Sequence, residues 1–122
     1  MAIVHQLFAI ASKMYSGRKP VRSESYRRFV KTYPCLVCQR RWGVEACHTG
    51  PHGLRQKSSD LSCIPLCREH HRTGNAALDK IGRVRFEMRW NLCISEVIEN
   101  LQYDYTILTG RLPEEQPERR AA

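Results

Sequence analysis

The hydrophobic pattern of the chain changes from helical spacing at its N-terminal end to short extended runs in its middle. Residues 1–15 carry apolar side chains three and four positions apart, as an amphipathic or buried helix does. A second helix is predicted over residues 24–32, where Ser23 can cap the first turn. Pro34 disfavours helical backbone just before it, so this helix should end there.

The middle of the chain predicts a small hairpin followed by a helix. Residues 42–47 fit a short strand, residues 49–59 fit an exposed loop rich in glycine and serine, and residues 60–66 fit a second strand or extended segment. A helix is expected to begin at Cys67 and to carry two adjacent histidines. The combination predicts an α+β domain.

The C-terminal third again has helical spacing. A helical pattern is interrupted near residues 81–83, and an amphipathic stretch over residues 90–101 follows, with Cys93 expected in the core. The 122 residues suffice for one small domain, which a bound metal would help to stabilise. The expected division is an N-terminal helix and basic linker (1–22), one domain (23–109) and a disordered tail (110–122).

Charge and cysteine content narrow the class of protein. Twenty Lys and Arg against twelve Asp and Glu give a net charge of +8, which favours a polyanionic partner such as DNA, although a merely basic soluble protein would also have this charge. Six cysteines would suit a secreted disulfide protein. However, residues 1–11 have no basic region before their apolar run and are too few to cross a membrane, so we expect a cytoplasmic protein, with a possible homodimer through the N-terminal helix.

The cysteine spacing predicts a structural zinc site. Cys35 and Cys38 form a C-x2-C turn, and after 28 intervening residues Cys67 and His70 form a C-x2-H pair. Two ligands from a turn and two from the start of a helix match tetrahedral zinc and a treble-clef finger. Two alternatives stay open at this point: Cys63 could replace His70 as the fourth ligand, or the cysteines could be ordinary core residues.

Two further histidines indicate hydrolytic chemistry. His48 follows the first predicted strand and His71 lies on the predicted helix, so a strand–loop–strand–helix unit could bring them together. One imidazole would accept a proton from water and the other would hold a divalent cation.

The middle of the chain contains the runs YPCLVC (33–38), EACHTGPHG (45–53), KSSDL (57–61) and IPLCREHH (64–71). Over residues 26–90 these runs resemble the HNH endonucleases, and more narrowly the small zinc-containing HNH proteins of phages and prophages, akin to recombination-enhancement nucleases. The resemblance implies a ββα-metal core. It also implies that His48 is the general base, that Asp60 replaces the middle asparagine of the motif, and that His71 is a ligand of the catalytic cation (Mg²⁺, Mn²⁺ or Zn²⁺).

One position departs from that family. The residue before the base is commonly Asp or His and serves as a second cation ligand, whereas here it is Cys47. A thiolate suits zinc better than magnesium, so Cys47, His52 and Glu45 are alternatives for this ligand.

Basic side chains flank the predicted site and are expected to contact DNA phosphates without reading bases. They are Arg55, Lys57, Arg68 and Arg72. The sequence thus favours a metal-dependent DNA endonuclease that hydrolyses phosphodiester bonds, and the resemblance implies a phage or prophage origin. The alternative is a noncatalytic zinc-finger module that binds DNA or protein.

Overall fold

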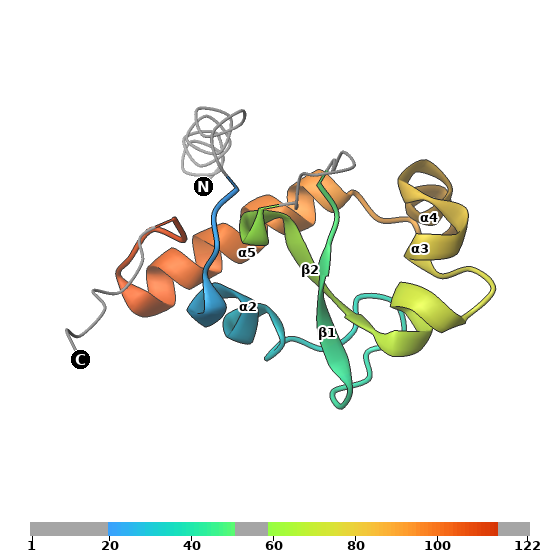
Figure 1. The fold of residues 1–122 in the computed structure, drawn as a ribbon, viewed down its shortest axis with the longest axis horizontal. Coiled ribbons are helices and arrows are strands. Elements are labelled where there is room, and N and C mark those ends of the chain that lie inside the picture. The colour runs from blue at the N-terminus through green and yellow to red at the C-terminus, as the bar shows by residue number, and fades with distance from the viewer. Residues whose placement is uncertain (1–19, 51–58, 115–122) are drawn as a thin grey trace.

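The computed structural model describes residues 20–50 and 59–114, and Figure 1 shows a two-stranded hairpin crossing a long helix. In chain order the described elements are α2 (Glu24–Val30), β1 (Val44–His48), the 3₁₀ turn η1 (Asp60–Ser62), β2 (Cys63–Cys67), the π-helical turn η2 (Glu69–Thr73), α3 (Leu78–Ile81), α4 (Arg83–Trp90) and α5 (Ile94–Thr109). The predicted α+β class is confirmed at this level.

Helix α2 begins where the sequence predicts. The Ser23 side chain accepts a hydrogen bond from the Tyr26 backbone N–H, which satisfies one of the unpaired donors of the first turn. The helix ends at Val30 rather than at residue 32, because the backbone N–H groups of Thr32 and Tyr33 donate to carbonyls only three residues earlier.

The hairpin pairs β1 with β2 in antiparallel register, with Val44 opposite Cys67 at one end and His48 opposite Cys63 at the other. Strand β1 begins two residues later than predicted, since Gly43 has a φ of 66° and breaks the extended backbone before it. The segment predicted as the second strand divides into η1 and β2, and all five residues of β2 are buried.

Pro65 occupies the middle of β2, opposite Ala46. Its carbonyl accepts a hydrogen bond from the backbone N–H of Leu36, 3.1 Å away, so the turn containing Cys35 and Cys38 lies along the edge of β2 that faces away from β1. Proline has no N–H to donate and is tolerated in a sheet at such an edge.

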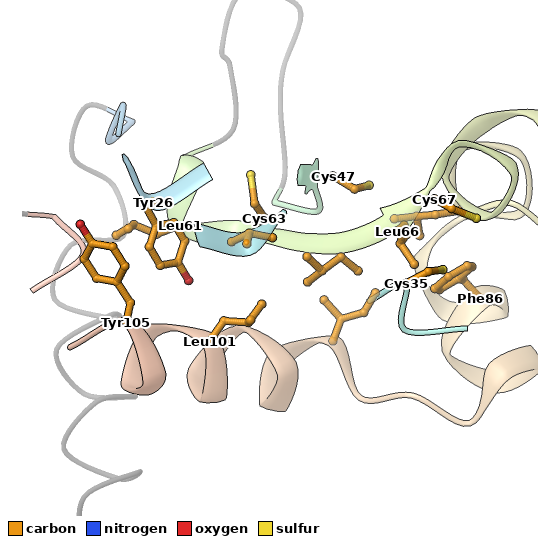
Figure 2. Packing of buried hydrophobic residues seen from close by; sticks show 14 residues of the cluster. Tyr26, Cys35, Cys47, Leu61, Cys63, Leu66, Cys67, Phe86, Leu101 and Tyr105 are labelled. Carbon is orange, nitrogen blue, oxygen red and sulfur yellow. The ribbon is translucent and has the colours of Figure 1, made fainter. Parts of the chain in front are cut away.

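The core is elongated along the hairpin, as Figure 2 shows. Tyr26 and Tyr105 meet edge to face at one end, with ring centroids 5.1 Å apart. Cys35 and Phe86 lie at the other end, and Leu101 of α5 packs between the two. The two ends of the hairpin are therefore stabilised by different sets of side chains.

The C-terminal helices confirm the predicted break near residues 81–83 but correct the predicted burial of Cys93. Gly82, with a φ of 82°, separates α3 from α4, as the interruption near residues 81–83 predicts. The expectation that Cys93 lies in the core is wrong: it is exposed, because it precedes α5 in extended backbone. Of the predicted tail, residues 110–114 are described, and Pro113 among them is buried.

Some predictions lie outside the described residues. They concern the N-terminal helix and its homodimer, the loop residues His52, Arg55 and Lys57, and the tail from residue 115. Among the helices of residues 20–50 and 59–114, none combines the length and the apolar character that crossing a bilayer requires.

Candidate functional site

Cys35, Cys38, Cys67 and His70, which we call the clamp, come together at one end of the hairpin. All four ligand atoms lie within 4.8 Å of one another. Tetrahedral zinc with Zn–S bonds of about 2.3 Å and a Zn–N bond of about 2.1 Å requires S–S separations of about 3.8 Å and S–N separations of about 3.6 Å. Here Cys38 Sγ lies 3.7 Å from Cys67 Sγ, and His70 Nδ1 lies 3.1 Å and 3.8 Å from the sulfurs of Cys67 and Cys35. The clamp could therefore bind a structural metal.

The backbone around the clamp is arranged to stabilise thiolates. Burial alone would raise the pKa of Cys35, but backbone N–H groups directed at its sulfur, among them those of Cys38 and Cys67, outweigh burial and lower it. Burial, together with the neighbouring thiols, raises the pKa of Cys67. The Cys35 thiol thus loses its proton more readily than the Cys67 thiol, and a metal bound at the clamp would favour the thiolate form.

Of the two candidates for the fourth ligand, His70 is the one that joins the three cysteines, and Trp90 supports it. The indole packs edge to face against the His70 ring at 5.4 Å, and its Nε1–H donates to the Ala76 carbonyl. Cys63 lies elsewhere, at the far end of β2.

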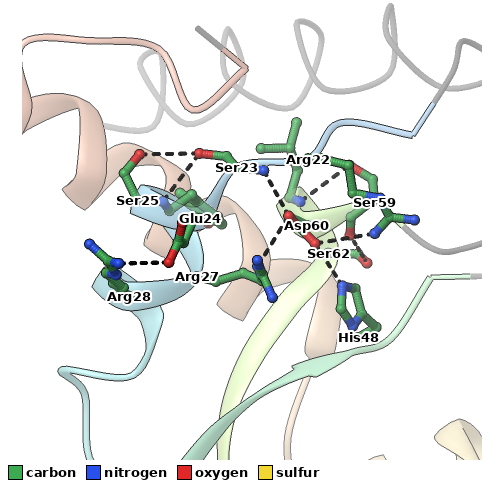
Figure 3. A network of polar contacts seen from close by, with 12 residues as sticks. Arg22, Ser23, Glu24, Ser25, Arg27, Arg28, His48, Ser59, Asp60 and Ser62 are labelled. Atoms are coloured by element: carbon green, nitrogen blue, oxygen red, sulfur yellow. Dashed lines mark hydrogen bonds and ion pairs between the residues drawn. The ribbon is translucent and has the colours of Figure 1, made fainter. Parts of the chain in front are cut away.

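The opposite end of the hairpin holds a second group of polar residues around a buried carboxylate (Figure 3). Asp60 is 1% exposed and accepts a hydrogen bond from the Ser23 N–H at 2.7 Å and one from His48 Nε2 at 2.8 Å. Arg22 and Arg27 each place a guanidinium nitrogen 3.3 Å from one of its oxygens. We call these five residues the Asp60 network.

The Asp60 network fixes the tautomer of His48. An ionised carboxylate can only accept hydrogen bonds, so the Nε2 atom of His48 carries the proton that it shares with Asp60. In the neutral imidazole Nδ1 then keeps its lone pair, and this atom has no hydrogen-bond partner among the described residues. The His48 side chain is 36% exposed, so solvent reaches part of the imidazole.

His48, Asp60 and Cys63 also form a group whose ligand atoms lie within 4.8 Å of one another. A cation there would meet the positive charges of Arg22 and Arg27 beside the same carboxylate. Burial, reinforced by the charge of Asp60, raises the pKa of the Cys63 thiol to about 12, which makes this thiol harder to deprotonate for a metal. The group is better suited to orienting His48 than to holding a metal.

His71 has a different carboxylate partner from His48. Its Nδ1 lies 2.8 Å from Glu45 Oε1, and its Nε2 lies 3.6 Å from Asp79 Oδ2, too far for a hydrogen bond. Burial would raise the pKa of Glu45, but hydrogen bonds from His71 and Arg72 outweigh it and lower the pKa below its ordinary value. In the neutral tautomer with the proton on Nδ1, the Nε2 lone pair faces the Asp79 carboxylate, an arrangement that a shared cation would stabilise.

The predicted residues therefore fall into separate groups. Among residues 20–50 and 59–114, no group of mutually close ligand atoms contains both His48 and His71. Cys47 lies between them on β1, and its buried thiol is kept protonated because burial, together with the charge of Asp79, raises its pKa. Arg72 pairs with Glu45 instead of standing free for DNA.

Arg22 and Arg27 belong to a basic region that the sequence assigns to phosphate contact, but their pairing with Asp60 and the place of Asp79 beside His71 were not predicted. Each is a common charged residue in a helix or linker, and only the long-range contacts give it a role. The basic stretch before Ser23 was the one local indication that Arg22 belongs to the site.

Comparison with known proteins defines a family but not an activity. A family model described as "Protein of unknown function (DUF968)" matches residues 14–108. "Uncharacterized protein YdfU" of Escherichia coli (strain K12) is 41% identical over 56 residues, which cover 39% of this chain and only 14% of that protein. No solved structure matches. Because the family model spans most of its length, the chain belongs to the DUF968 family.

Proposed function

We propose that this protein is a metal-dependent DNA endonuclease in which His48 is the general base. The observation that carries the proposal is the 2.8 Å hydrogen bond between His48 Nε2 and Asp60, which is 1% exposed. A buried carboxylate behind an imidazole orients the ring and stabilises its protonated form, so that Nδ1 can take a proton from the attacking water.

The surroundings of His48 suit a phosphodiester. Arg22 and Arg27 have side chains that are 45% and 43% exposed while each also contacts Asp60. Their positions beside the imidazole would let them contact a phosphate while Asp60 keeps them in place. The +8 charge of the chain would draw DNA to the molecule.

The donor set around His71 fits a hard divalent cation. The Nε2 atom of His71 and the carboxylate of Asp79 would be ligands, and Glu45 would orient the imidazole through Nδ1. When bound, the cation would stabilise the negative charge that develops on the phosphate and the leaving oxygen. Cys47 is a poor alternative, because a hard cation prefers oxygen and nitrogen ligands to sulfur and because burial raises the pKa of this thiol.

The test is nicking of supercoiled plasmid by the full chain with Mg²⁺ or Mn²⁺. We expect His48→Ala to slow nicking about 100- to 10,000-fold, the usual contribution of a general base. Added imidazole should restore part of the rate, while binding of a short duplex, followed by fluorescence anisotropy, should stay unchanged. If His48→Ala nicks as fast as the parent protein, His48 is not the base.

Two further variants separate the roles. Arg27→Ala should weaken nicking, whereas Arg28→Ala, on the same helix but paired with exposed Glu24, should not. Asp79→Asn should raise the Mg²⁺ concentration needed for half-maximal rate, a change that His48→Ala should not produce.

A second candidate function is a noncatalytic DNA- or protein-binding module built on the clamp. It is favoured by the separation of His48 and His71 into different groups. DNA binding by the parent protein without nicking in Mg²⁺, Mn²⁺ or Zn²⁺ would support this function over the endonuclease.

A further inference from the structure

Among the large apolar side chains that are exposed in the described part of the chain, Trp42 is the aromatic one. Its side chain is 72% exposed, whereas the other large apolar residues exposed in residues 20–50 and 59–114 are aliphatic and lie on helices or beyond the end of α5. An indole stabilises a fold mainly through the large surface that it buries. Trp42 buries little of it, so its role in the folded protein has to be sought at the surface.

The backbone on both sides of Trp42 is held in defined turns. The Cys35 N–H donates to the Arg40 carbonyl and the Gln39 N–H donates to the Cys35 carbonyl, both at 2.9 Å. After Trp42 comes Gly43, whose φ of 66° leads directly into β1. A Cβ atom at position 43 would meet nothing within 4 Å, so space does not require glycine there. Glycine is favoured because it adopts the positive φ without strain. Trp42 thus lies between the turn of the clamp, whose backbone hydrogen bonds extend to Arg40, and the start of β1.

Positive charge accompanies the indole. The guanidinium of Arg40 lies 5.4 Å from the centroid of the Trp42 ring, which is cation–π distance, and the neighbouring Arg41 is exposed. The nearest acid to Arg40 is Glu69, at 4.0 Å and itself 58% exposed, so this pair contributes little and leaves the surface basic. The guanidinium covers one face of the indole, and the 72% exposure requires the opposite face to be open.

An open aromatic face beside two arginines fits a polyanion that also presents flat rings. Unpaired bases can stack on such a face while the arginines contact the flanking phosphates. Bases inside a duplex are already stacked on both sides and cannot do so. A protein partner would also cover an exposed tryptophan, but the charge of the chain and of this surface favours nucleic acid.

We propose that Trp42, with Arg40 and Arg41, forms a stacking platform for an unpaired base of single-stranded DNA. The proposal deepens the proposed function by naming a substrate with unpaired bases, and it rests on that function only for the choice of DNA over RNA. The platform is built on the turn of the clamp and requires no cleavage.

The test is binding of a fluorescein-labelled 12-nucleotide DNA of mixed sequence, single-stranded or annealed to its complement, without added divalent cation. We expect Trp42→Ala to weaken single-strand binding about 5- to 100-fold and duplex binding less than about twofold, as loss of one stacking platform implies. Met88→Ala, which removes an aliphatic side chain that is 78% exposed, is the matched control and should change neither affinity.

Two more variants separate stacking from general hydrophobic contact. Trp42→Phe keeps an aromatic face and should retain most of the single-strand affinity, whereas Trp42→Leu keeps apolar bulk and should behave like Trp42→Ala. Metal content and circular dichroism would verify that each variant is folded. The proposal is overturned if Trp42→Ala leaves single-strand binding unchanged, if it weakens single-strand and duplex binding equally, or if the same sequence in RNA binds more tightly.

These outcomes are separable from failure of the endonuclease. A parent protein that nicks no plasmid but loses single-strand affinity on Trp42→Ala would refute the catalysis and keep the platform. A parent protein that nicks plasmid but binds single-stranded DNA equally well after Trp42→Ala would support the catalysis and refute the platform.

Discussion

The two ends of the hairpin carry out the same structural task with different chemistry. At the Val44–Cys67 end, the clamp joins the turn, β2 and η2 through four ligand atoms within 4.8 Å of one another. At the His48–Cys63 end, the Asp60 network joins α2, β1 and η1 through hydrogen bonds and ion pairs, above the Tyr26–Tyr105 contact. A metal at the clamp would come from outside the chain, whereas the Asp60 network consists of side chains and backbone alone, so we expect that each end can be weakened separately.

The largest expected effect comes from loss of the metal. Structural zinc sites have apparent binding free energies of about 10–16 kcal/mol at pH 7. This free energy adds to the stability of the folded protein and is lost when the metal is removed. Chelation should therefore lower the melting temperature strongly and speed amide hydrogen exchange around the clamp more than around Asp60. Hydrogen exchange with mass spectrometry measures this difference, and equal acceleration at both ends would contradict it.

Two cysteine variants provide a matched test of whether the clamp binds a stabilising metal. Cys38 and Cys93 are both exposed, but only Cys38 belongs to the clamp. Cys38→Ser should lose bound metal and melt at a lower temperature, while Cys93→Ser should match the parent protein in both measurements.

An intermediate effect is expected at the other end. Asp60→Ala removes the acceptor of the Ser23 N–H and of His48 and leaves two guanidinium groups without their carboxylate. Hydrogen bonds to charged groups contribute about 1.5–3 kcal/mol each, and the half-exposed arginines recover some hydration, so we expect a loss of about 3 kcal/mol in the free energy of unfolding. Urea unfolding measures it. Metal content should not change, and a variant that loses its metal would show that the two ends are coupled.

The smallest effect is expected for Glu45→Gln, because Glu45 is exposed enough for solvent to screen its pairs with His71 and Arg72. The expected loss at pH 7 is less than about 1 kcal/mol. The pKa of Glu45 is lower in the folded protein than its ordinary value of 4.5, so the unfolded chain takes up the proton first as the pH falls. The contribution is thus complete above about pH 4.5 and disappears as the pH falls through the folded pKa.

Urea unfolding of parent and Glu45→Gln between pH 7 and pH 3 would measure this trend as a shrinking difference. Glu24→Gln, which alters an exposed pair with Arg28, provides the control for loss of an exposed carboxylate. If the difference in the free energy of unfolding between parent and Glu45→Gln grows as the pH falls, the predicted pH dependence is wrong.

The sequence was sufficient to predict features that depend on neighbouring residues or on the chemistry of metal ligands. Ser23 as a cap, the break near Gly82 and the grouping of Cys35 with His70 all follow from short-range patterns or from the valence of a metal. The Arg22–Asp60 pair spans 38 positions and depends on how α2 docks on the hairpin, which no local pattern encodes. Similarly, the assignment of His48 and His71 to different carboxylates depends on strand register and on where α3 packs.

The proline in the middle of β2 also bears on how this molecule behaves among copies of itself. Within a strand, the N and the carbonyl of one residue point to the same side. Because the Pro65 carbonyl faces the Leu36 N–H, its nitrogen also lies on the edge away from β1, where a third strand would need a donor. That edge is therefore both covered and chemically incomplete, which protects a very small sheet against intermolecular strand addition and aggregation.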